Sequence, residues 1–124
     1  MSAMPANEDD PLTLLYVPCG SEAEALALGH ALVAAGLIAC ANLHPIRSIY
    51  RWEGRVVDEA EVVLLAKTPA GHVAAAETEI RRRHSYTTPC ILRLPAASVN
   101  ADYLAWAQAA VSADPSRAGG GDGL

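Results

Sequence analysis

The stretch "HSYTTPC", residues 84 to 90, places a histidine and a cysteine six positions apart. Copper and zinc accept both imidazole and thiolate donors, so His84 and Cys90 are candidate metal ligands. The same pair could act as a general base and a nucleophile if the two groups lie within hydrogen-bonding distance. The simpler interpretation is structural: His84 ends a helix and Pro89 stiffens the entry to a strand. Because two ligands leave a tetrahedral site incomplete, a bound metal would also need water or a residue from a neighbouring subunit.

Aromatic and charged side chains form a second group, on two expected strands. Tyr50 and Trp52 point to one side of the first strand, and Glu61 and Lys67 share one side of the second. Glu61 and Lys67 lie roughly 20 Å apart in an extended chain, so they cannot pair within one subunit. We hypothesise a cleft between subunits, where an aromatic wall and opposite charges hold a small polar ligand. The alternative is that these charges only mark the edge of a buried zone.

The three cysteines show no C-x-x-C spacing. This argues against a disulfide scaffold, a zinc ribbon and a thioredoxin motif, and it indicates a reducing compartment. Cys19, in a turn, and Cys40, in a strand, are interpreted as small packing residues. We expect a cytoplasmic protein.

Length and charge exclude several classes of protein. The 124 residues, 52% of them hydrophobic, predict one domain with a modest core. A net charge of -5 and a pI near 5.2 predict no nucleic-acid partner. We interpret the basic run at 81–83 as the solvated face of a helix. No apolar run approaches the roughly 18 to 20 residues that span a bilayer, so no membrane association is expected.

The order of elements predicts an α+β protein with a ferredoxin-like, split βαβ arrangement. We expect Ser21 and Glu24 to form a capping box, a bulge near Pro45, and Thr68 to cap the second helix. The expected elements are a strand at 11–17, a helix at 21–36, a β-hairpin at 38–67 that turns at Glu53 and Gly54, a helix from Thr68 to His84, a strand at 90–95 and a C-terminal helix at 101–111. We therefore divide the chain into a flexible N-terminus at 1–10, one domain at 11–112 and a disordered tail at 113–124.

This arrangement predicts self-association. Two helices cover only one face of a four-stranded sheet, so something else must cover the other face. The hairpin is also long enough to reach past a compact domain of this size. Assembly through the open face and the hairpin would bury both.

Three segments, "ACANLHPIRSIYRWEGRVVDEAEVVLLAKT", "HSYTTPCILRLP" and "DYLAW", resemble the CutA family of divalent-cation tolerance proteins. The resemblance covers about residues 12 to 111. It implies a ferredoxin-like fold assembled as a homotrimer, similar to the PII signalling proteins, and a link to copper or other divalent ions without an established enzymatic reaction. Family members commonly have proline at the position of Ser85 and an acidic residue at the position of Cys90, whose thiol is a softer donor.

We therefore predict a non-enzymatic homotrimer that binds a divalent metal ion or a small polar ligand between its subunits. The predicted metal ligands are His84 and Cys90. A PII-like signalling or structural trimer is the alternative, and an enzyme that uses His84 with Cys90 or Tyr86 has less support. The predicted ligand cleft comprises Tyr50, Trp52, Glu61, Lys67, Tyr86 and Trp106.

Overall fold

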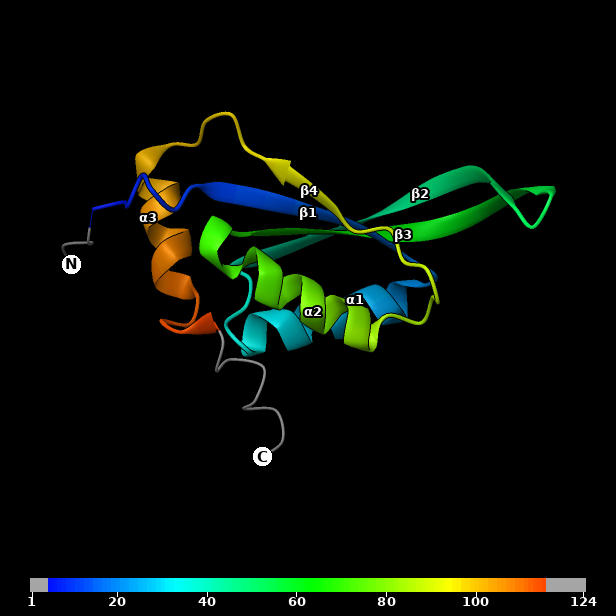
Figure 1. The fold of residues 1–124 in the computed structure, drawn as a ribbon, viewed down its shortest axis with the longest axis horizontal. Helices are drawn as coiled ribbons and strands as arrows, with labels where there is room; N and C mark the ends of the chain where they lie inside the picture. Colours follow the sequence, from blue (N-terminus) through cyan, green and yellow to red (C-terminus); the bar gives the residue numbers. More distant parts are fainter. Residues whose placement is uncertain (1–4, 116–124) are drawn as a thin grey trace.

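A computed structural model of the chain describes residues 5–115, in an arrangement of four strands and three α-helices (Figure 1). Residues 1–4 and 116–124, which carry parts of the predicted flexible N-terminus and tail, lie outside the described residues. The elements are β1 (Leu12–Cys19), α1 (Glu22–Ala34), β2 (Cys40–Trp52), β3 (Arg55–Pro69), a short 3₁₀-helix (Ala70–His72), α2 (Val73–Arg83), β4 (Leu92–Pro95) and α3 (Ala101–Ala110).

The strands form one antiparallel sheet in the order β2-β3-β1-β4. This order, with α1 and α2 as the two crossovers, confirms the predicted α+β, ferredoxin-like fold. Both helices lie on the same face of the sheet (Figure 1). The fold therefore has one helix layer and one sheet layer.

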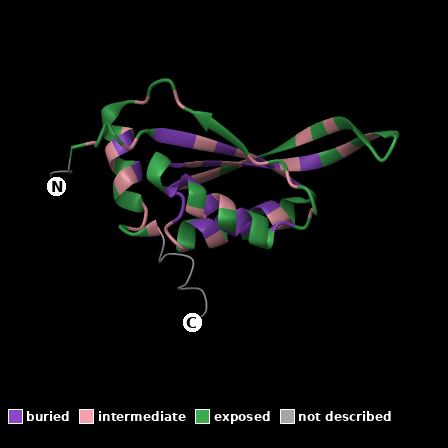
Figure 2. Cartoon of the chain, in the orientation of Figure 1, coloured by how far each residue is buried: buried purple, intermediate pink, exposed green. Residues whose placement is uncertain are grey.

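The main core fills the space between the helices and the sheet. Strand residues Leu15, Val17 and Leu64 are fully buried there against Leu32 and Ile80 of the helices. Figure 2 shows buried residues concentrated along β1 and on the inner sides of α1 and α2. A smaller cluster, which includes Leu12, Ala39, Leu104 and Ala107, packs α3 against one end of the sheet.

The other face of the sheet has no helix layer among residues 5–115, as expected (Figure 1). Leu92 and Leu94 of β4 are 49% and 43% exposed. Since Leu94 pairs with Leu14, and Leu92 with Tyr16, these side chains lie on the face opposite Leu15 and Val17. We call this the uncovered face.

The β2–β3 hairpin extends beyond the other two strands, and its distal half is largely exposed (Figures 1 and 2). It turns at Glu53 and Gly54, whose positive φ angles of 50° and 79° fit a two-residue type I′ turn. The predicted bulge near Pro45 is wrong, because pairing runs without interruption from Cys40 opposite Lys67 to Trp52 opposite Arg55. β2 is the edge strand of this sheet, a position that tolerates a residue without an N–H.

Two predicted helix starts need correction. Thr68 does not cap α2: it is still paired within β3, opposite Thr13, and its hydroxyl donates to the Leu37 carbonyl at 2.9 Å. The capping box of α1 is only half formed, because the Ser21 hydroxyl accepts from the Glu24 amide at 3.1 Å while the Glu24 carboxylate binds elsewhere.

The segment before β1 contacts other parts of the fold. The Gln108 side chain accepts a hydrogen bond from the Asn7 amide at 2.9 Å and donates to the Asn7 carbonyl at 2.8 Å. The Asp10 carboxylate accepts a hydrogen bond from the Gly71 amide at 2.7 Å. These contacts hold residues 7–10 against α3 and the start of the second crossover.

Candidate functional site

A cavity of about 490 Å³ opens where the hairpin leaves the body of the sheet. We call it the hairpin pocket. Strands β2 and β3 contribute two residues each, the end of β1 contributes one, and the loop between α2 and β4 supplies the rest. The lining residues are Pro18, Tyr50, Trp52, Glu59, Glu61, Ser85, Tyr86, Thr87, Thr88 and Cys90.

Strand alternation explains why side chains of the hairpin meet in this pocket. Tyr50 pairs opposite Val57, which lies two residues from Glu59 and four from Glu61, so all four side chains share one face of the hairpin. This face continues into the uncovered face of the sheet. The pocket is therefore built on the side of the molecule that the helices leave open.

Two phenol–carboxylate pairs organise the pocket. The Tyr86 hydroxyl donates to Glu61 Oε2 at 2.7 Å, and the Tyr50 hydroxyl donates to Glu59 Oε1 at 2.5 Å. Burial and the hydrogen bond to Glu61 raise the pKa of Tyr86 well above its ordinary value. The hydrogen bond to Glu59 raises the pKa of Tyr50 to about 12. Both phenols therefore remain protonated donors at neutral pH.

His84 lies behind the pocket and holds the loop that carries Tyr86. Its Nε2 lies 2.9 Å from the Pro18 carbonyl, and its Nδ1 accepts a hydrogen bond from the Tyr86 amide at 3.0 Å. A single tautomer, with the proton on Nε2, satisfies both contacts. The imidazole and the Tyr86 ring are also in contact, with centroids 4.7 Å apart. In this conformation, His84 is a positioning residue for Tyr86.

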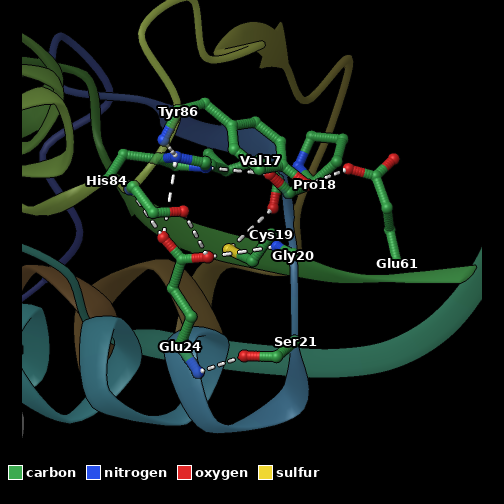
Figure 3. A network of polar contacts seen from close by, with 10 residues as sticks. Val17, Pro18, Cys19, Gly20, Ser21, Glu24, Glu61, His84 and Tyr86 are labelled. Carbon is green, nitrogen blue, oxygen red and sulfur yellow. Dashed lines mark hydrogen bonds and ion pairs between the residues drawn. The ribbon is translucent and has the colours of Figure 1, made fainter.

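The Glu24 carboxylate joins the start of α1 to the same loop (Figure 3). It accepts hydrogen bonds from the Ser85 amide at 2.8 Å, the Ser85 hydroxyl at 3.0 Å and the Gly20 amide at 3.1 Å. Burial alone would raise the pKa of Glu24, but the hydrogen bonds from Ser85 and Gly20 outweigh burial and lower it. The ionised carboxylate thus connects two loops that are far apart in the sequence.

The structure brings together five of the eight predicted site residues. Cys90 is exposed on the pocket wall, while His84 is buried behind it. The five that line the hairpin pocket are Tyr50, Trp52, Glu61, Tyr86 and Cys90.

Lys67 and Trp106 do not line the hairpin pocket. The Lys67 ammonium is 5.8 Å from the centroid of the Tyr103 ring, and that ring lies 5.4 Å from the ring of Trp106. Lys67 is six residues from Glu61 along β3, or roughly 20 Å in an extended strand. Within one chain, Lys67 and Trp106 therefore form a separate cluster with Tyr103, in which both aromatic residues belong to α3.

Sequence reasoning missed residues that line the pocket and residues that support it from behind. Glu59 lies two positions from Glu61, so strand alternation alone could have identified it. Gly20 is a subtler case: a side chain there would come within 3.3 Å of the Tyr86 hydroxyl, so glycine leaves room for the ring. Glu24 was assigned only to helix capping, and no local signal indicates its contact with Ser85.

Comparison with known proteins identifies the family. The sequence model of the CutA1 divalent ion tolerance protein family matches residues 13–110. The chain belongs to the CutA1 family. It is 40% identical to the divalent-cation tolerance protein CutA of Thermus thermophilus over 98 residues, which cover 78% of this chain and 93% of that protein. The CutA of Archaeoglobus fulgidus is 34% identical over 92 residues, with 74% and 90% covered.

Solved CutA structures have the same fold. The structure of CutA from Synechococcus elongatus superposes with a TM-score of 0.80 at 32% identity, covering 90% of this chain and 96% of that chain. The Thermus thermophilus protein superposes with a TM-score of 0.77 at 35% identity, covering 82% and 99%. The matched region contains the whole hairpin pocket, so the pocket belongs to the CutA1 domain itself.

Among residues 5–115, no three His, Cys, Asp or Glu side chains are grouped so that they could hold a metal ion. In that range, no helix has the length and apolar character needed to cross a membrane.

Proposed function

We propose that this CutA-type divalent-cation tolerance protein acts as a homotrimer that binds a metal ion or a small polar ligand at the hairpin pocket, without a catalytic step. The observation that carries this proposal is the pocket itself: two carboxylate residues, three aromatic residues and a cysteine line one cavity of about 490 Å³. A concave site with a few convergent polar groups is the usual form of a ligand site.

The uncovered face supports the trimer. Leu92 and Leu94 expose apolar surface there, and β2 presents an unpaired edge among the described strands. Apolar surface and free strand edges both favour association with another chain. In a closed trimer, each copy would use the same two surfaces, and no edge would be left open.

Copper remains the proposed metal, with Cys90 and His84 as its donors. The exposed Cys90 thiol is a soft donor that suits copper. His84 could coordinate only after releasing the Pro18 carbonyl or the Tyr86 amide. One described chain therefore offers an incomplete set, and the remaining donors would come from a neighbouring chain or from water.

A calorimetric titration of Cu²⁺ into the assembled protein tests this proposal. We expect Cys90→Ser and His84→Ala each to weaken binding, whereas Cys40→Ser, which removes a half-buried thiol outside the pocket, leaves it unchanged. Light scattering on each sample confirms that the assembly is intact. Affinities equal to the parent in both pocket variants would remove copper from this site.

An enzymatic role for His84 and Cys90 has weaker support. A general base needs a free ring nitrogen near the group from which it takes a proton. Both nitrogens of His84 are engaged by backbone groups, and neither contact involves Cys90. We therefore propose binding without catalysis.

A further inference from the structure

The hairpin pocket contains two carboxylates that have no positively charged partner within residues 5–115. Glu61 is only 7% exposed, and Glu59 is half-buried beside it. Among the residues that the structure describes, neither carboxylate takes part in an ion pair. Their hydrogen-bond donors are the neutral hydroxyls of Tyr86 and Tyr50. Each of these hydroxyls satisfies one carboxylate oxygen and leaves the charge in place.

This imbalance is costly. A carboxylate removed from water loses hydration that a single phenol replaces only in part, and a nearby cation is the usual compensation. Two other carboxylates of the chain do have cationic partners: the buried Glu79 pairs with Arg82 and Arg83, and the half-buried Glu77 pairs with Arg93. The pocket is therefore arranged to receive a cation from outside the chain.

The walls of the pocket favour an organic cation over a hard metal ion. Hard ions such as Mg²⁺ and Ca²⁺ require about six or more oxygen ligands at fixed distances, and aromatic rings contribute nothing to that shell. The rings of Trp52, Tyr50 and Tyr86 instead offer faces that attract ammonium groups and cover methylene groups. Thr87 and Thr88 line the same cavity, and threonine hydroxyls can accept hydrogen bonds from an ammonium group.

The spacing of the carboxylates defines the ligand further. Glu59 and Glu61 are two residues apart on one face of β3, so their backbones are about 6 to 7 Å apart. That distance is comparable to the separation of the two nitrogens in an extended four-carbon diamine.

We propose that the hairpin pocket binds a short aliphatic diamine, with one ammonium group at Glu61, the other at Glu59, and the methylene chain against Trp52 and Tyr50. This inference rests on the proposed function in one respect: it takes the hairpin pocket as the ligand site of the protein. The proposed trimer and the proposed copper site do not depend on diamine binding.

Calorimetric titration of the full chain with putrescine tests the proposal. We expect saturable binding of one diamine per chain, and binding of butylammonium that is weaker by at least about tenfold, because the second charged hydrogen bond is lost. Glu61→Gln and Glu59→Gln should each weaken putrescine binding by a similar factor. The glutamine oxygen can still accept from the tyrosine, so the pocket keeps its shape while it loses charge.

The matched control is Glu22→Gln, which removes the same charge from an exposed position in the first turn of α1, outside the pocket. It should leave the affinity for putrescine unchanged. Thermal melting of every variant shows whether the chain is folded, and Glu59→Gln keeps the test decisive if the more deeply buried Glu61 does not tolerate substitution.

Three results would overturn the proposal: no saturable binding of putrescine, equal affinity for putrescine and butylammonium, or unchanged affinity in both pocket variants. A fourth result would also overturn it: putrescine does not bind, and the pocket variants change the mass of the assembly. That result would show that a cationic side chain of a neighbouring chain occupies the pocket. Mass by light scattering and a separate Cu²⁺ titration of the parent protein decide the proposed function independently. An intact trimer that binds copper but no diamine would refute this inference alone.

Discussion

The two faces of the sheet show how differently one set of strands can be used. On the helix-covered face, Leu15, Val17 and Leu64 are fully buried and make the core. On the uncovered face, β4 carries exposed leucines and, farther out, the β2–β3 hairpin carries the two carboxylates and two of the rings of the hairpin pocket. Because strand side chains alternate, the sequence can assign one face to stability and leave the other for assembly and ligand binding.

The largest stability effect should come from the covered face. Leu64→Ala removes a fully buried side chain and should lower the free energy of unfolding by about 2 to 5 kcal/mol. The oligomeric mass should not change. Chemical denaturation measures this loss, and Leu26→Ala, at an exposed position of α1, is the matched control. A loss below about 1 kcal/mol would show that the helix-covered face is not the principal core.

A charge on the uncovered face should affect assembly instead. Leu94→Asp places a carboxylate on the apolar surface of β4 and should reduce the mass measured by light scattering toward that of one chain. Circular dichroism should show that the fold is retained. The control is Val33→Asp on α1, since the two native side chains are similarly exposed, at 43% and 45%. If both variants kept the parent mass, β4 would not lie in a subunit interface.

Glu24 links the covered helices to the pocket loop. Glu24→Gln weakens charged hydrogen bonds from Ser85 and Gly20 and should cost about 1 to 3 kcal/mol. Glu22→Gln, in the same first turn of α1, controls for charge at the helix start. Urea denaturation of the two variants should show a loss only for Glu24→Gln. Equal stability of both variants would mean that the connection contributes nothing.

The same carboxylate predicts a pH dependence. The pKa of Glu24 in the folded chain is lowered, so its stabilising contribution is present above the ordinary glutamate pKa and disappears as pH falls through the folded-state value. Because the pKa values of Glu77 and Glu79 are also lowered, the parent protein should lose stability in acid for several reasons. The difference between parent and Glu24→Gln should nevertheless shrink as the pH falls. A difference independent of pH would contradict this assignment.

The smallest effect should come from Lys67. Lys67→Met removes a cation–π contact with Tyr103 and should cost no more than about 1 kcal/mol. Since Lys67 lies far from the hairpin pocket of its own chain, putrescine binding should be unchanged. Lost binding would instead show that assembly brings Lys67 of another copy to the pocket, as the sequence alone suggested.

The fold was predictable because its signals are local. Short apolar and extended runs marked the strands, and Ser21 marked the start of α1. The errors at Thr68 and Pro45 arose where a local signal competed with strand pairing. Thr68 resembles a helix cap but is held in the β1–β3 ladder, and Pro45 is accommodated because β2 is an edge strand.

The site was predictable only in part. Alternation and the family resemblance identified Tyr50, Trp52 and Glu61, all of which line the pocket. The hydrogen bond between Tyr86 and Glu61 depends on how the loop after α2 crosses the end of β1, and no sequence period encodes that path. The contacts of His84 could not be predicted for the same reason, because its backbone partners are visible only in three dimensions.

The central claim is that the uncovered face of this chain is completed by other copies of the chain. Light scattering coupled to size-exclusion chromatography, on the full chain at micromolar concentration, tests this claim directly. The predicted result is a mass about three times the 13.0 kDa of one chain, maintained on dilution across the micromolar range. A mass of 13.0 kDa would contradict the claim and leave the exposed leucines and the hairpin without the partner proposed for them.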